Sequence, residues 1–80
     1  MYFVYLLLCE DNSIYTGITV NIENRLRRHK NGSGAKYTRA RKPVQVLYTE
    51  QHETRKAAAK REAQIKRWKR GKKLELILSS

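Results

Sequence analysis

The hydrophobic pattern of the first twenty residues predicts a β-hairpin. Residues 2–8 form a continuous run of apolar and aromatic side chains, which is typical of a strand buried on both faces. Turn-forming residues follow at 11–13, and a second apolar run begins at residue 14 and ends at residue 18. We expect the two runs to pair antiparallel, with the first strand in the middle of a sheet.

The next segment has the period of an amphipathic helix. Ile22, Leu26 and His29 recur at the spacing of one helix face, and the Asn21 side chain can cap the exposed backbone N–H groups before them. The stretch Asn-Gly-Ser-Gly that follows favours termination. The pattern therefore predicts a helix over residues 22–30.

The second half of the chain predicts one strand and two helices. Pro43 opens a third strand at residues 44–49. Residues 54–69 have a helix-favouring composition rich in Ala, Lys and Arg, with Thr54 as the N-cap. Gly71 predicts a break in the helix. A short final helix is expected after it, with Leu74, Ile77 and Leu78 on its apolar side.

The expected order of elements is ββαβαα. This order predicts an α+β fold, with a small three-stranded mixed or antiparallel sheet flanked by helices. Eighty residues suffice for one domain of this kind, so we expect residues 1–80 to form a single domain.

The net charge of the chain indicates a class of binding partner. The chain has 18 Lys and Arg residues but 7 Asp and Glu residues, which gives a formal net charge of +11. Such an excess favours a polyanionic partner, so we expect nucleic acid. Four basic side chains of a predicted loop at residues 35–42 are expected to hold its backbone: Lys36, Arg39, Arg41 and Lys42.

The number of cysteines and the length of the first apolar run indicate the cellular compartment. Cys9 is the only cysteine, which excludes an intramolecular disulfide and favours a reducing environment. The apolar run at residues 2–8 is too short to cross a bilayer and leads into acidic residues. We therefore expect a cytoplasmic protein without a membrane partner.

Glu62 is the first candidate for chemistry. It lies in a basic helix, and its spacing from Ala58 and Ile65 turns it toward the core side, where a carboxylate needs a partner. One interpretation is an ion pair with Arg61, Lys66 or an arginine of another helix. The other is a metal ligand, because Mg²⁺ keeps most of its waters and can be held by one carboxylate and a substrate phosphate.

Two further pairs of residues are open to a structural or a catalytic interpretation. Arg25 and His29 share one helix face, either as part of a basic surface or as a phosphate clamp with a proton relay. Tyr5 and Tyr15 lie on the two strands of the predicted hairpin, either as a packing pair or as a source of a phenol that acts as a base. Composition does not choose between these interpretations.

Several short motifs follow one another along the chain in a recognisable order. They are Phe3-Val4-Tyr5, Tyr15-Thr16-Gly17 ten residues later, Arg25 with His29, the sequence GAKYT at residues 34–38, and Glu62 in a later helix. This combination resembles the GIY-YIG endonuclease superfamily. It is most similar to the small single-domain bacterial members, and also to the N-terminal incision module of the UvrC repair protein.

The resemblance implies a ββαβαα fold and divalent-metal-dependent hydrolysis of a phosphodiester bond. Tyr5 and Tyr15 match the tyrosines of the two motifs, one of which is thought to help activate the attacking water. Gly17 matches the motif glycine, where a missing side chain allows close approach.

The resemblance also implies roles for three side chains outside the hairpin. Arg25 and His29 match the arginine and the frequent histidine of the family's first helix. Glu62 matches the metal-binding glutamate, so Mg²⁺ or Mn²⁺ is the expected cofactor.

The chain departs from the family pattern at three points. Its first motif reads Phe-Val-Tyr where the family has Gly-Ile-Tyr, and its second reads Tyr-Thr-Gly where the family has Tyr-Ile-Gly. Residues 69–80 do not supply the additional polar residue, often asparagine, that many relatives carry after the glutamate helix.

Together these features predict a metal-dependent endonuclease for DNA or structured nucleic acid, acting in repair or recombination. A protein partner would supply specificity. The alternative is a non-catalytic nucleic-acid-binding module on structured RNA or the ribosome. Such a module would use the same charge without requiring the Tyr, Arg and Glu side chains to converge.

Overall fold

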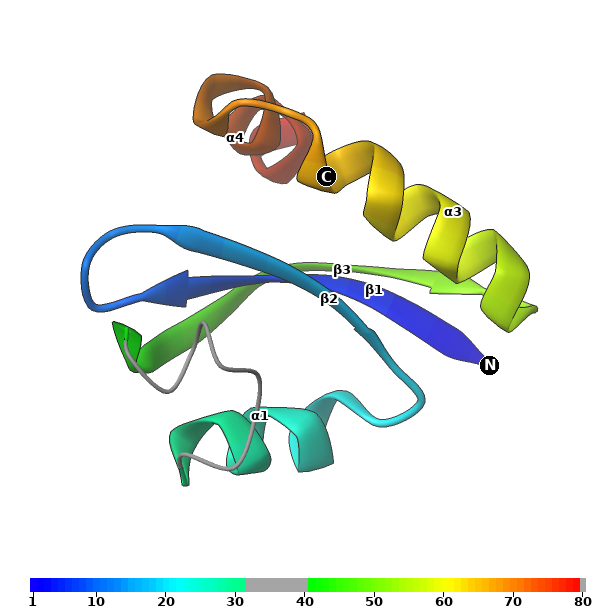
Figure 1. The fold of residues 1–80 in the computed structure, drawn as a ribbon, viewed down its shortest axis with the longest axis horizontal. Coiled ribbons are helices and arrows are strands. Elements are labelled where there is room, and N and C mark those ends of the chain that lie inside the picture. The colour runs from blue at the N-terminus through cyan, green and yellow to red at the C-terminus, as the bar shows by residue number, and fades with distance from the viewer. Residues whose placement is uncertain (32–40, 80) are drawn as a thin grey trace.

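The computed structural model describes residues 1–31 and 41–79. These residues form three strands and three helices in the order ββαβαα. The three strands form one antiparallel sheet with the spatial order β2-β1-β3. Figure 1 shows α1 on one side of this sheet and α3 and α4 on the other. The bounds are β1 Tyr2–Cys9, β2 Ile14–Thr19, α1 Ile22–Lys30, β3 Pro43–His52, α3 Arg55–Lys66 and α4 Arg70–Ser79. The predicted α+β class is confirmed.

Strand β1 is the central strand, as its continuous apolar pattern predicts. Successive side chains of a strand point to opposite faces. Val4 and Leu6 therefore face α3, where they form a buried cluster with Ile65 and other apolar residues. Tyr5 and Leu7 are also buried, on the face that carries α1. A strand with both faces covered can place a polar group such as a phenol in a desolvated position.

Two of the helices begin at the predicted capping residues. The Asn21 side chain accepts a 2.9 Å hydrogen bond from the backbone N–H of Asn24 at the start of α1. The Thr54 hydroxyl accepts a 3.1 Å hydrogen bond from the backbone N–H of Ala57 at the start of α3. Each cap satisfies a backbone donor that the helix itself leaves unpaired, so local sequence fixes both starting points.

Strand β3 is longer than the hydrophobic pattern predicts. It pairs with the whole of β1, from the partners Tyr2 and His52 to the partners Cys9 and Pro43. The register shifts twice, after Leu6 and after Leu8. Both irregularities lie within the predicted residues 44–49. The strand is longer because it continues through residues 50–52, which are polar and which the hydrophobic pattern therefore did not count.

The boundary between the last two helices also differs from the prediction. α3 ends at Lys66 instead of residue 69, and α4 begins before Gly71. The backbone N–H of Trp68 bonds to Ile65 O, and the Trp68 ring packs against the core, so the chain turns before Gly71 is reached. Gly71 therefore lies in the first turn of α4 instead of ahead of the helix.

Candidate active site

Tyr5 and His29 form a buried hydrogen-bonded pair between the sheet and α1. The Tyr5 hydroxyl lies 2.8 Å from His29 Nε2, and the two residues are 3% and 1% exposed. His29 is the buried residue of α1, which the predicted helix face placed toward the sheet. The pair joins residues 24 positions apart in the sequence, so it depends on the docking of α1.

Gly17 provides the space that this arrangement needs. It pairs directly with Tyr5 across the β1–β2 ladder. A Cβ at Gly17 would lie 2.5 Å from the Tyr5 hydroxyl oxygen and 3.0 Å from Tyr15 Cε2. These distances are shorter than ordinary van der Waals contact, so any other residue would displace one of the tyrosines. The motif glycine therefore acts through packing around the two phenols.

Tyr15 completes an aromatic cluster with Tyr5 and His29. Its ring centroid lies 6.2 Å from that of Tyr5 and 5.4 Å from that of His29, the latter in an edge-on arrangement. Tyr15 is half-buried, whereas the other two residues are buried. Side chains from β1, β2 and α1 thus meet at one place, with Tyr15 nearest to solvent.

The environment keeps both buried members of the cluster uncharged at neutral pH. Burial raises the pKa of Tyr5, and the neighbouring Tyr15 raises it further, while Arg25 acts in the opposite direction. Burial lowers the pKa of His29, and the positive charge of Arg25 adds to this effect. The Arg25 charge therefore acts on both groups of the pair.

Glu62 approaches the same cluster from α3. Its charge contributes to raising the pKa of Tyr5, so it too lies within electrostatic range of the phenol. Its Oε2 is 3.4 Å from Lys66 Nζ, one helical turn away, and its side chain is 21% exposed. Lys66 Nζ in turn lies 6.0 Å from the centroid of the Tyr15 ring. The lysine is therefore the ion-pair partner, while Arg61 bonds elsewhere.

The carboxylate of Glu62 fits a hard divalent cation of the kind that GIY-YIG nucleases generally use. It is only partly exposed, and its partner Lys66 is itself half exposed, so an ion could reach its oxygens. Within residues 1–31 and 41–79 no group of three or more His, Cys, Asp or Glu could hold a metal. The donor set matches an ion that takes one carboxylate, waters and substrate phosphate.

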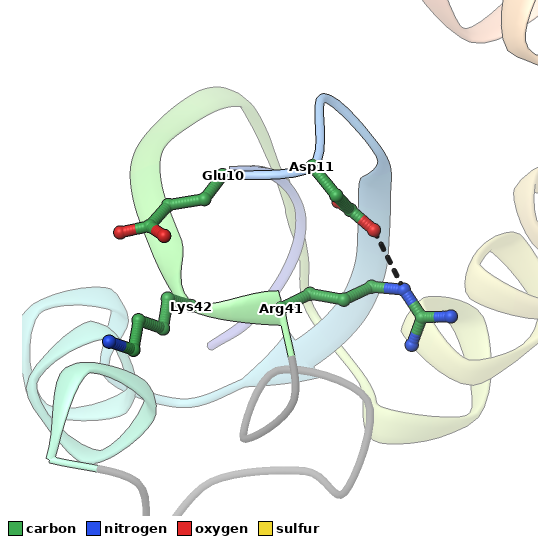
Figure 2. Close-up of a pocket in the computed structure, with 4 residues that line it drawn as sticks. All are labelled: Glu10, Asp11, Arg41 and Lys42. Atoms are coloured by element: carbon green, nitrogen blue, oxygen red, sulfur yellow. Dashed lines mark ion pairs between the residues drawn. The ribbon is translucent and has the colours of Figure 1, made fainter.

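The basic segment before β3 is only partly described. Lys36 and Arg39 lie outside the described residues. Arg41 Nε forms a 2.9 Å ion pair with Asp11 Oδ2 at the tip of the β1–β2 hairpin, and Lys42 points away from this pair (Figure 2). The ion pair offsets the charge of Arg41, which makes Arg41 a weaker candidate for a backbone contact than the sequence suggests.

A pocket of about 590 Å³ lies at this hairpin tip (Figure 2). Its described lining residues carry two negative and two positive side chains: Glu10, Asp11, Arg41 and Lys42. The aromatic cluster does not contribute to this lining. The mixed charge gives the pocket no preference for an anion, so the aromatic cluster is the better candidate for the reaction centre.

Sequence reasoning missed a polar cluster that joins β3 to α3. The Glu50 carboxylate accepts a 2.5 Å hydrogen bond from the Tyr48 hydroxyl and a 3.0 Å hydrogen bond from Arg61 Nε, and its Oε2 lies 2.7 Å from His52 Nε2. The alternation Tyr-Thr-Glu-Gln-His was the available signal, because it places Tyr48, Glu50 and His52 on one face of a strand.

Comparisons with known proteins show which family the chain is similar to. The family model of the GIY-YIG catalytic domain matches residues 1–75. A UPF0213 protein of Staphylococcus saprophyticus is 49% identical over 95% of this chain and 93% of the relative. A UPF0213 protein of Clostridium perfringens is 51% identical over 99% of this chain and 85% of the relative.

A solved structure shows the same similarity at the level of the fold. The solution NMR structure of a UPF0213 protein from Bacillus halodurans superimposes with a TM-score of 0.64, at 37% identity, and covers 100% of this chain and 86% of that one. In the described part of the chain, none of the helices is long and apolar enough to span a membrane. On these matches and this fold, the chain belongs to the GIY-YIG family, within the nuclease superfamily of that name.

Proposed function

We propose that this protein is a metal-dependent endonuclease that hydrolyses phosphodiester bonds in DNA, with repair or recombination as its setting. The contacts among Tyr5, Tyr15 and His29 carry the proposal. The charges of Arg25 and Glu62 also act on the Tyr5 hydroxyl, which supports placing all five side chains in one site. A module that only bound nucleic acid would not need a buried phenol–imidazole pair beside an arginine and a carboxylate.

The distribution of charge supports a nucleic-acid substrate. Residues 54–80 contain 10 of the 18 Lys and Arg residues but 2 of the 7 acidic residues. The helices α3 and α4, which carry most of these bases, lie together on one side of the sheet (Figure 1). A polyanion attracted to this side would be brought next to Glu62 and Tyr15.

The Tyr5–His29 pair is suited to relaying a proton. A free phenolate at Tyr5 is disfavoured, because burial raises its pKa. Tyr5 can instead accept a proton from the attacking water while its own proton passes to His29 Nε2, so the phenol stays neutral. The lowered pKa of His29 keeps the imidazole unprotonated and able to accept that proton.

The remaining residues would position the substrate and stabilise charge. The water oxygen forms a bond to phosphorus as the bond to the leaving sugar oxygen breaks, and that oxygen takes a proton from solvent. The guanidinium of Arg25 would offset the negative charge that grows on the phosphate oxygens. Tyr15, at the solvent side of the cluster, would orient the water. A divalent ion on Glu62 would supply Lewis-acid polarisation of the phosphate.

The test is a cleavage assay on branched, flapped, damaged and single-stranded DNA and on matched RNA, with Mg²⁺, Mn²⁺ or EDTA. We expect metal-dependent cleavage of at least one DNA substrate and none with EDTA. Binding of these substrates without cleavage under any metal condition would favour the non-catalytic module. A dependence on an added protein fraction would point to a partner that supplies specificity.

A further inference from the structure

A second pocket lies between β2, α3 and α4, next to the candidate active site. It has a volume of about 300 Å³ and is lined by Ile14, Tyr15, Thr16, Lys66 and Lys73. It shares Tyr15 with the aromatic cluster, and Lys66 lies 3.4 Å from Glu62. Whatever occupies this pocket is therefore an immediate neighbour of the proposed reaction centre.

Two lysines from different helices converge on this pocket. Lys66 ends α3, and Lys73 lies near the start of α4. Lys73 is half-buried, and its pKa is lowered by burial and by the positive charge of Lys66. Two ammonium groups held near each other repel, and an anion placed between them would remove that repulsion.

The strand side of the pocket adds a hydrogen-bonding group without a partner. Thr16 is 2% exposed, and its hydroxyl oxygen has no hydrogen-bond partner among the described residues. Buried hydroxyls are nearly always paired, because an unpaired one loses its bond to water without compensation. An oxygen atom entering the pocket would satisfy this hydroxyl, directly or through one water.

We propose that this pocket binds a backbone phosphate of the nucleic acid, on the same strand as the phosphate that is cleaved and adjacent to it. The inference rests on the proposed function, and it assigns Lys66, Lys73 and Thr16 as a positioning subsite. Ile14 supplies the apolar wall against which a sugar can pack. Phosphate contacts of this kind fix the register of the strand without reading its sequence.

The first experiment uses inorganic phosphate as the probe and needs no catalytic activity. NMR signals of Thr16 and Lys73 are followed during titration with phosphate, and separately with sodium chloride at the same ionic strength. We expect saturable shifts with phosphate only. Lys73→Gln should weaken this binding by about tenfold or more, on the scale of one lost charge-assisted hydrogen bond.

Matched variants separate the pocket from general charge. Lys69→Gln removes the same charge from an exposed position that does not line the pocket, and it should bind phosphate as the wild type does. Thr16→Val keeps the shape of the side chain and removes the hydroxyl, so it should weaken binding severalfold. Equal weakening in Lys69→Gln and Lys73→Gln, or no saturable shift in the wild type, would overturn the subsite.

The second experiment locates the phosphate on the substrate. Single methylphosphonate groups, which lack the charge, are introduced at each position around the cleaved bond. We expect the neighbouring substitution to raise KM in the wild type and to raise it clearly less in Lys73→Gln, where Lys66 and Thr16 remain, with kcat little changed. Independent, multiplicative effects of the two changes would contradict the proposal. Failure to cleave any substrate would sink the proposed function, while the phosphate titration would still decide on the pocket.

Discussion

In the described residues, two clusters bring a tyrosine close to a histidine, and the two clusters favour opposite charge states of their groups. Between the sheet and α1, Tyr5 and His29 bond to each other at 2.8 Å, and burial favours the neutral form of both. On the other side of the sheet, Tyr48 and His52 both lie within hydrogen-bond distance of the Glu50 carboxylate. One cluster favours two neutral groups that share a hydrogen bond, and the other favours a negative charge.

The two glutamates show the same contrast. Burial raises the pKa of Glu50, but the hydrogen bonds from Tyr48, His52 and Arg61 outweigh burial and lower it. Glu50 thus has a structural role, because its bond to Arg61 joins β3 to α3. Glu62, in comparison, contacts Lys66 of its own helix at 3.4 Å. A carboxylate whose oxygens bond to several side chains of the fold contributes to stability, whereas one with fewer such bonds can still accept bonds from a ligand.

The largest expected effect concerns Glu62. Glu62→Gln should abolish cleavage, because an amide is a poorer ligand for a hard cation, while the thermal midpoint changes little. Nucleic-acid binding should persist or tighten, since one negative charge is lost. Cleavage, binding and thermal unfolding are measured on the same variant. A destabilised variant that keeps wild-type metal affinity would make Glu62 a structural residue like Glu50.

Arg25→Ala should lower turnover by roughly a hundredfold, on the scale of one lost transition-state donor. Affinity for the substrate should fall far less, because many other basic residues remain. Single-turnover rates and binding isotherms separate the two quantities. Equal losses in rate and affinity would mean that Arg25 only binds the nucleic-acid backbone and does not act in the transition state.

Glu50→Gln should show the reverse profile. It weakens charge-assisted bonds to Arg61 and its neighbours, so unfolding free energy should fall by about 1.5–3 kcal/mol. Turnover well below the melting temperature should stay at the wild-type level. The lowered pKa of Glu50 stabilises the fold at neutral pH, and this contribution is lost as pH falls through the folded-state pKa, below the ordinary 4.5. Wild-type and variant stabilities should therefore converge in acid.

The smallest expected effect is the pH dependence that His29 produces. Its pKa is lowered on folding, so the folded state binds the proton less tightly than the unfolded state does. Stability should therefore decrease as pH falls below 6.5, the ordinary pKa of the imidazole, and level off below the folded-state pKa. Denaturant unfolding of the wild type and of His29→Asn between pH 4.5 and 7.5 checks this. An unchanged slope in the variant would assign the dependence to another group.

The sequence by itself determined the elements and their order. The caps at Asn21 and Thr54 are local, since a side chain satisfies a backbone N–H three residues away. The central position of β1 follows from its continuous apolar run, because only a strand covered on both faces can bury every side chain. The family resemblance rested on the same kind of information, namely residue types at fixed spacing.

Only the tertiary structure decided which side chains are partners. Hydrophobic periodicity places His29 on the inner face of α1, but the docking of the helix brings Nε2 to the Tyr5 hydroxyl. The same holds for Arg61, which reaches across to Glu50 on β3 although Glu62 is its neighbour in sequence. Such contacts join residues far apart in the chain. Their distances depend on how whole elements pack, and a local pattern carries no information about that.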